Sequence, residues 1–159
     1  MQTFLPYEDL EKSVKSLDYR RLGKQRVEAM QLLSSIYIED YSWRSHPASK
    51  MWRPYPEALQ MYMDLCIDEW VSRGYKNTMT KSNIVTDKMP IWLGDERLHA
   101  SHRSNLLKKD LDFYSVYQWR EPNDLPYFWC GYADSDKDNY SSIEPITRDS
   151  LVMRQELEL

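Results

Sequence analysis

The stretch that most constrains how this chain folds is residues 17–33, LDYRRLGKQRVEAMQLL. Apolar side chains recur along it at helical spacing: Leu22, Val27, Met30 and Leu33. This spacing predicts an amphipathic helix that buries these side chains on one face and runs on to about position 38. The remaining helices are expected to pack around it.

The first half of this predicted helix is strongly cationic, with Arg20, Arg21, Lys24 and Arg26. Cations at a helix start are disfavoured by the positive end of the helix dipole. We therefore expect either that Asp18 caps the helix and offsets this cost, or that the cluster is held ready for an anion. This cluster of cations fits either a solvated charged face or a phosphate-binding surface.

One polar face of the helix carries a possible catalytic group. Arg21, Gln25 and Glu28 are spaced at i, i+4 and i+7, so they share a face. A carboxylate next to cations can act as a general acid or base, and Gln25 can position a water. Glu28 can equally form a simple surface ion pair with Arg21 or Lys24.

Composition favours helices over strands. The 159 residues include only four Gly and no long run of β-branched residues. Aromatic residues are numerous, with six Trp and twelve Tyr. We expect an all-α protein, a single compact helical domain with aromatic-rich loops, over residues 1–133. An acidic C-terminal tail follows at 134–159, and the apolar spacing of residues 147–159 suits a short last helix.

The apolar residues 1–7 are expected to tuck into the body of the domain, because free termini are usually polar. Three further helices are expected from apolar spacing and flanking Pro or Gly residues, at about Glu8–Leu17, Pro56–Arg73 and Asp95–Tyr117. Residues 39–55 and 118–133 are expected to form aromatic-rich loops.

Bulk charge does not exclude a nucleic-acid partner. Residues 131–159 carry seven acidic and three basic side chains, which accounts for the whole net charge of −4. The chain has no apolar stretch long enough to cross a membrane and no signal-peptide core, so we expect a cytoplasmic protein. In that compartment Cys66 and Cys130 are expected to remain separate core thiols.

Several familiar kinds of site are missing from the sequence. It has no Gly-rich phosphate loop and no Gly-x-Ser-x-Gly nucleophile motif. The pair His99 and His102 is weak as a metal motif, because no CxxC or HExxH accompanies it. We expect no metal and no cofactor.

Basic and aromatic side chains alternate in three places, around Arg20–Arg26, Trp43–Arg53 and His99–Arg103. Arg and Lys suit phosphates, and Trp or Tyr faces suit exposed bases, so DNA or a nucleotide-like ligand is the expected partner. An enzyme that acts on a base within a duplex must first expose it.

The N-terminus offers a nucleophile. Gln2 is large, so we expect the initiator methionine to stay and the α-amine to belong to Met1. An α-amine titrates near neutrality and needs no deep burial to react. Its attack on a deoxyribose C1′ would give a Schiff base, and a carboxylate such as Glu28 could assist opening of the sugar ring.

The sequence resembles the pyrimidine-dimer DNA glycosylase family, the viral endonuclease V-like enzymes of UV repair, and is closest to the longer bacterial and phage relatives. The resemblance spans about residues 1–130. It rests on these motifs: MQTFLP at 1–6, RLGKQRVE at 21–28, Trp43 with HPA at 46–48 and Met51-Trp52, Trp70 with RGY at 73–75, HASHR at 99–103 with Lys108, and PYFW at 126–129.

The resemblance implies an all-helical protein with its N-terminus in the DNA-binding face, and glycosylase plus abasic-site lyase activity through an N-terminal amine. By position, Met1 would supply the amine, and Arg20 and Lys24 match phosphate-contacting arginines. The family's catalytic Glu falls on Arg21 here, which is no carboxylate. Glu28, two turns along the same face, is our proposed substitute.

The residues proposed as catalytic are Met1, Glu28 and Gln25. The residues proposed to bind DNA are Arg20, Arg21, Lys24, Arg26, Trp43, Arg44, His46, Trp52, His99, His102, Arg103 and Lys108. For Trp52 a core position is the competing interpretation. Two other functions stay open at this point: a non-catalytic nucleic-acid- or nucleotide-binding module of the same fold, and a nuclease that uses His46, His99 and His102 as acid–base groups.

Overall fold

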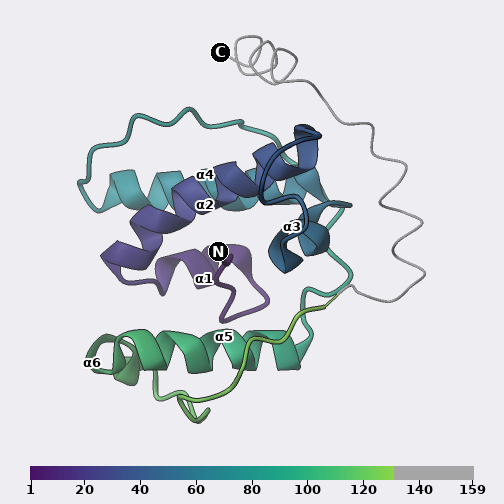
Figure 1. Cartoon of the computed structure of the whole chain (residues 1–159). Coiled ribbons are helices and arrows are strands. Elements are labelled where there is room, and N and C mark those ends of the chain that lie inside the picture. The colour runs from purple at the N-terminus through teal and green to yellow at the C-terminus, as the bar shows by residue number, and fades with distance from the viewer. Residues whose placement is uncertain (131–159) are drawn as a thin grey trace.

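The cationic helix forms as α2, Tyr19–Tyr37, and packs against α3 and α4 in the computed structural model, which describes residues 1–130 (Figure 1). Within that range the chain is all-α and has no strand. The other elements are α1 (Leu10–Lys15), α3 (Pro47–Trp52), α4 (Pro56–Ser72), α5 (Glu96–Lys109), α6 (Leu111–Tyr114) and a 3₁₀ turn (Ser115–Tyr117).

Asp18 caps α2, as the sequence predicted. Its side chain accepts a hydrogen bond from the Arg21 N–H at 3.4 Å, and the Arg21 guanidinium lies 3.3 Å from the same carboxylate oxygen. The Tyr114 hydroxyl donates to the other oxygen. The buried cap therefore places a negative charge at the cationic start of the helix, which offsets the unfavourable dipole.

The predicted buried face of α2 was partly wrong. Val27 and Met30 are 38% and 39% exposed, whereas Leu22 and Leu33 are buried as expected. The side chains of α2 that are buried are Leu22, Gln25, Ala29, Leu32, Leu33, Ser35, Ile36 and Tyr37. The helix is rotated relative to the prediction because a polar side chain, Gln25, lies on the face that packs into the protein.

Two loop and helix boundaries also differ from the prediction. The expected loop at 39–55 contains α3, which His46 caps by accepting a hydrogen bond from the Ala48 N–H. The expected helix at 95–117 is interrupted at Asp110, whose φ of −154° leaves the helical region. Its carboxylate then caps α6 by accepting from the Phe113 N–H at 3.1 Å.

The first residues of the chain lie between α2 and α5, with the N-terminus near the centre of Figure 1. Gln2, Thr3, Phe4 and Leu5 are all buried, which confirms that the apolar terminus tucks into the body. Trp52 is fully buried and donates its Nε1–H to Thr3 at 2.8 Å, so its core position is confirmed.

Cys66 and Cys130 are buried free thiols. No helix within residues 1–130 is both long and apolar enough to cross a membrane. The proposed acidic tail at 134–159 and its short helix lie outside the described residues, as does the domain boundary at 133.

Candidate active site

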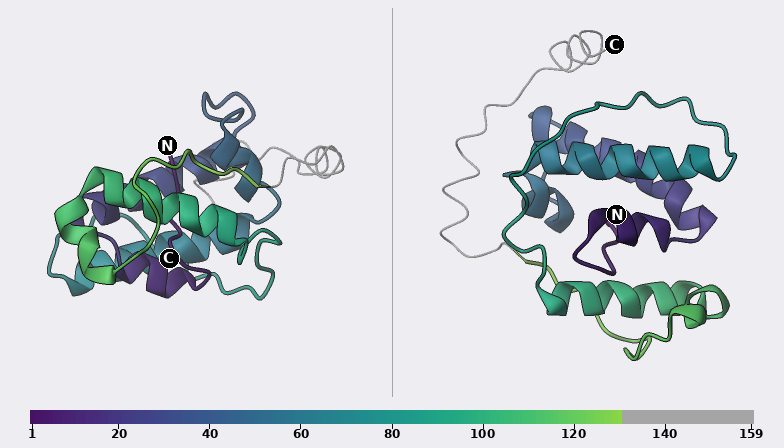
Figure 2. Two further views of the ribbon diagram at one scale, coloured as in Figure 1. Left: turned by 90° about the horizontal axis from the view of Figure 1, so that it is seen from below. Right: turned by 180° about the vertical axis from the view of Figure 1, so that it is seen from behind.

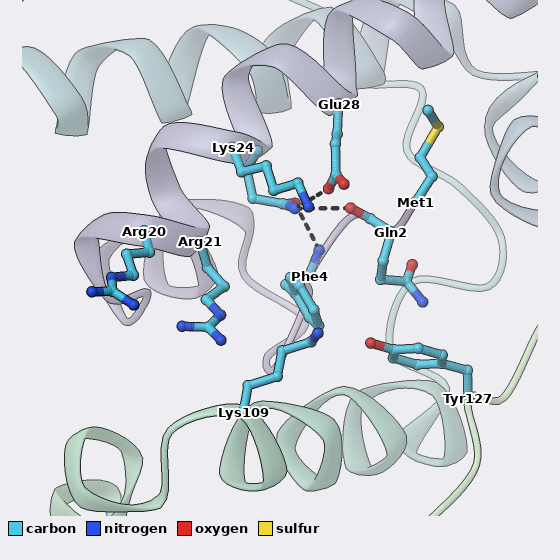
Figure 3. Close-up of a pocket in the computed structure, with 10 residues that line it drawn as sticks. Met1, Gln2, Phe4, Arg20, Arg21, Lys24, Glu28, Lys109 and Tyr127 are labelled. Carbon is cyan, nitrogen blue, oxygen red and sulfur yellow. Dashed lines mark hydrogen bonds between the residues drawn. The ribbon is translucent and has the colours of Figure 1, made fainter.

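A pocket of about 420 Å³ opens beside the N-terminus, where four distant parts of the chain meet (Figure 3). Its lining residues come from the N-terminal segment, from α2, from the end of α5 and from the last described loop: Met1, Gln2, Phe4, Arg20, Arg21, Lys24, Gln25, Glu28, Lys109 and Tyr127. The volume falls in the range of pockets that hold small ligands, and a nucleotide is within that size.

Gln25 joins the N-terminal segment to α2. Its Oε1 accepts from the Phe4 N–H at 2.9 Å and from the Tyr62 hydroxyl at 2.6 Å. Its Nε2 donates to the Gln2 carbonyl and to a Glu28 carboxylate oxygen, both at 2.8 Å (Figure 3). The amide is 1% exposed, and its donors and acceptors are used in a fixed orientation. It therefore fixes the position of residues 2–4 relative to Glu28.

Glu28 lines the same pocket as Met1, and the positive charge of the Met1 α-amine acts on its carboxyl. Burial raises the pKa of the Glu28 carboxyl, and the positive charges of the Met1 α-amine and of Lys24 oppose this rise, as do its hydrogen bonds to Gln2 and Gln25. A carboxyl with a raised pKa keeps its proton to a higher pH than a free carboxyl does, which is a property of general acids and bases in enzymes. The N-terminal residue and a carboxyl with a raised pKa thus line one pocket.

The pocket is otherwise cationic. Arg20, Arg21 and Lys24 enter from α2, and Lys109 enters from the opposite side at the end of α5 (Figure 3). Among the described residues that line it, Glu28 is the one with a carboxylate. Such a cluster favours an anion, and phosphate is the anion that arginine and lysine both hold well.

The sequence predicted that His99 and His102 contact DNA, but both side chains are buried and neither is exposed to a partner. His99 bonds the Leu5 carbonyl at 2.7 Å and accepts from the Gly94 N–H at 2.9 Å. His102 accepts from the Leu5 N–H at 2.9 Å. Burial lowers the pKa of His102 to about 3, which keeps its ring neutral. Both rings hold the N-terminal segment against α5.

Other predicted DNA-binding residues have contacts within the protein. Arg103 is bound to Glu121, to Glu96 and to the Pro6 carbonyl. Arg26 donates to Asn77 and lies 4.4 Å from the centre of the Trp70 ring. Arg44 reaches two backbone carbonyls at the end of α2. Trp52 belongs to the core, so it cannot stack on a base without unfolding.

The remaining predicted residues lie around the pocket or on the surface. His46 is half-buried, and burial together with the positive charge of the Met1 α-amine lowers its pKa. Its ring contacts the exposed Trp43 at 5.8 Å between centres. Lys108 is exposed on α5, but its neighbour Lys109 is the one that lines the pocket.

Sequence reasoning missed four lining residues: Gln2, Phe4, Lys109 and Tyr127. Gln2 and Phe4 were placed in the tucked terminus but given no role in a site. Lys109 and Tyr127 are far from the N-terminus in sequence, and no local pattern distinguishes them. The adjacent Lys108 and the aromatic run at 127–129 were the signals available.

The comparison with protein families gives one match: the model of the pyrimidine dimer DNA glycosylase family covers residues 1–83. No curated protein and no solved structure matches the chain. The family match contains the N-terminal segment and the α2 side of the pocket, with Met1, Gln25 and Glu28. Because it covers more than half of the chain, this protein belongs to the pyrimidine dimer DNA glycosylase family.

Proposed function

We propose that this protein is a DNA glycosylase with abasic-site lyase activity, acting on damaged or modified pyrimidines in DNA. The observation that carries the proposal is that Met1 and Glu28 line one cationic pocket although a helix and a loop separate them in sequence. The family membership supports a DNA substrate and a glycosylase reaction.

DNA binding is assigned to the cations of the pocket. Arg20 and Lys24 lie on α2 at one side and Lys109 at the other, so phosphates on both sides of a target nucleotide find a partner. Arg21 is paired with Asp18 and is partly neutralised, so we assign it a weaker share of the binding.

The chemistry begins at the α-amine of Met1, which in its neutral form attacks C1′ of the deoxyribose. The glycosidic bond breaks, and the base leaves with the bonding electrons and takes up a proton. The Glu28 carboxylate accepts a proton from the positively charged nitrogen now bonded to C1′ and gives it to the ring oxygen as the bond between C1′ and that oxygen breaks, which leaves a Schiff base between the nitrogen and C1′. Loss of a C2′ proton and of the 3′-phosphate then cleaves the strand.

Glu28 fits the role of the catalytic carboxylate, and position 21 does not. Arg21 is held by the helix cap, whereas Glu28 faces the pocket, receives a hydrogen bond from Gln25 and interacts with the Met1 α-amine. The histidine-based nuclease has less support, because His99 and His102 use their rings to hold Leu5. The arginine at position 21, which is no carboxylate, favours the non-catalytic module slightly, whereas the presence of Met1 and Glu28 in one pocket favours the enzyme.

Borohydride trapping on a duplex with one abasic site tests the proposal. The protein with a free N-terminus should form a covalent adduct, and a variant with one extra residue before Met1, protected from processing, should not. Glu28→Gln should form the adduct much more slowly while still binding the duplex. Absence of an adduct from the folded wild-type protein would overturn the lyase activity. A duplex with a single thymine dimer then tests base removal separately.

A further inference from the structure

Trp43 presents part of its indole to solvent. It lies in the loop that joins α2 to α3, and it is 41% exposed. Tryptophan is a costly side chain to leave in water, because it offers a large apolar area for burial. Its exposed indole is therefore a surface on which an aromatic or apolar group can stack.

The backbone of the loop at Trp43 is hydrogen-bonded to α3 and its cap. The Trp43 carbonyl accepts hydrogen bonds from the Ser49 hydroxyl at 2.7 Å and from the His46 N–H at 3.0 Å. The buried Ser49 hydroxyl is itself bonded to Ser35 of α2 at 2.8 Å. The neighbouring Arg44 reaches the carbonyls at the end of α2. The backbone that carries the indole is thus braced by hydrogen bonds, an arrangement that lowers the entropy cost of ordering the side chain on a partner.

A series of ring contacts links Trp43 to the pocket. Trp43 contacts His46 at 5.8 Å between ring centres, His46 contacts Trp129 at 5.7 Å, and Trp129 contacts Tyr127 at 5.7 Å. Tyr127 lines the pocket, and the positive charge of the Met1 α-amine reaches His46. The left view of Figure 2 shows the loop between α2 and α3 on the same side of the molecule as the N-terminus.

We propose that Trp43 is a wedge residue, whose indole stacks on the base that is exposed when duplex DNA opens at the nucleotide taken up by the pocket. This inference rests on the proposed function. Enzymes that extrude a nucleotide must offset lost base stacking, and an apolar or aromatic side chain inserted at the gap does so without reading sequence. In this arrangement the cations of the pocket bind the DNA backbone, and Trp43 keeps the duplex open next to the extruded nucleotide.

A comparison of duplex and single-stranded DNA distinguishes a wedge from a general binding residue. The probe is one oligonucleotide with an abasic site, used alone and in a duplex, with borohydride trapping under single-turnover conditions. Trp43→Ala should slow adduct formation on the duplex by about tenfold or more. It should leave the rate on the single strand within about twofold, because no partner strand has to be opened.

Two variants control for fold and for loss of apolar surface. Trp43→Phe should recover most of the rate on the duplex, since phenylalanine also stacks. Phe113→Ala removes from α6 an aromatic side chain of similar exposure, 38%, which is not among the residues that line the pocket, and should behave as the wild type. Equal slowing of Trp43→Ala on both DNAs, or no slowing on the duplex, would overturn the wedge.

A binding measurement keeps this inference separate from the proposed chemistry. The duplex carries a stable tetrahydrofuran abasic analogue with 2-aminopurine beside it. At saturation the wild-type protein should quench the 2-aminopurine by stacking, and Trp43→Ala should bind without that quenching. If the wild type quenches but forms no Schiff base, the wedge stands and the lyase fails. Equal fluorescence in both complexes, or failure of the wild type to bind this duplex, refutes the wedge.

Discussion

Replacing Gln25 by alanine removes the side chain that joins the N-terminal segment to α2. Three of its four hydrogen-bond partners are buried: the Phe4 N–H, the Tyr62 hydroxyl and the Gln2 carbonyl. The fourth partner, the Glu28 carboxylate, is half-buried and can accept a hydrogen bond from water instead, so its loss should add little to the change in stability. At about 1 kcal/mol net for each bond to a buried partner, the free energy of unfolding should fall by about 3 kcal/mol.

The same variant should slow the reaction more than its stability loss explains. Without the amide, the Gln2 carbonyl and the Phe4 N–H lose their anchors, and Met1 is free to move relative to Glu28. A displacement of about 1 Å at a reacting group costs on the order of a hundredfold in rate. Adduct formation on abasic duplex should fall by about that factor at a temperature where the variant is folded.

Urea unfolding followed by circular dichroism gives the stability, and single-turnover borohydride trapping gives the rate. Gln31→Ala is the matched control, because it removes the same side chain from a half-buried position on α2 that does not line the pocket. The reasoning is refuted if Gln25→Ala loses less than about 1 kcal/mol and reacts at the wild-type rate.

Four further outcomes follow from the structure. Burial raises the pKa of Glu28, and the carboxylate form accepts the proton, so Glu28 should contribute a fall of the pH–rate profile of trapping on the acid side, at a pH above the ordinary glutamate range. Because the attacking amine must also be neutral, Glu28→Gln should remove only the part of the acid-side fall that the carboxyl causes. Gly23→Ala should destabilise the protein by about 1 kcal/mol in thermal unfolding, because the new Cβ would lie 2.8 Å from the Trp70 ring and this overpacking outweighs the gain in helix propensity. In a protein that already carries Trp70→Leu, Gly23→Ala should instead stabilise the fold. Lys109→Ala should lower the slope of log affinity against log salt by about one in a DNA-binding titration. His102→Ala should lower the free energy of unfolding in urea by about 2 kcal/mol, because the Leu5 N–H loses its acceptor. The folded fraction of this variant should still form the adduct. Complete loss of the reaction in folded protein would favour a histidine-based mechanism.

The existence of α2 and its cap could be predicted from local sequence, because both depend on neighbouring residues. Asp18 precedes the helix at the position where a carboxylate meets free N–H groups. The buried face could not be predicted in the same way. Hydrophobic spacing favoured Val27 and Met30, but the backbone of the N-terminal segment provides partners for a buried Gln25, and that contact is long-range.

The histidines show the same limit. His99 and His102 share a strip of α5 with Arg103, and a polar strip on a helix is normally a surface feature. Here Leu5 lies across that strip, and its N–H and carbonyl are satisfied by the two rings. No pattern within α5 indicates that a distant backbone segment covers it.

The proximity of Met1 and Glu28 was predictable only in part. Helical spacing put Arg21, Gln25 and Glu28 on one face, and all three line the pocket. The apolar character of the terminus indicated that it is tucked in, and the family resemblance placed it beside that helix. Lys109 and Tyr127 line the other side of the pocket. Both lie outside residues 1–83, which the family model matches, and no local sequence pattern marks either of them as a site residue.

The most direct test of the central claim is to identify which amine is trapped on abasic DNA. Lys24 and Lys109 also line the pocket, so an adduct alone does not prove that the N-terminus reacts. Borohydride-reduced adduct should be digested with trypsin and nuclease and mapped by mass spectrometry. We expect the sugar remnant on the α-amine of the peptide Met1–Lys12. A remnant on Lys24 or Lys109, with Met1 unmodified, would contradict it.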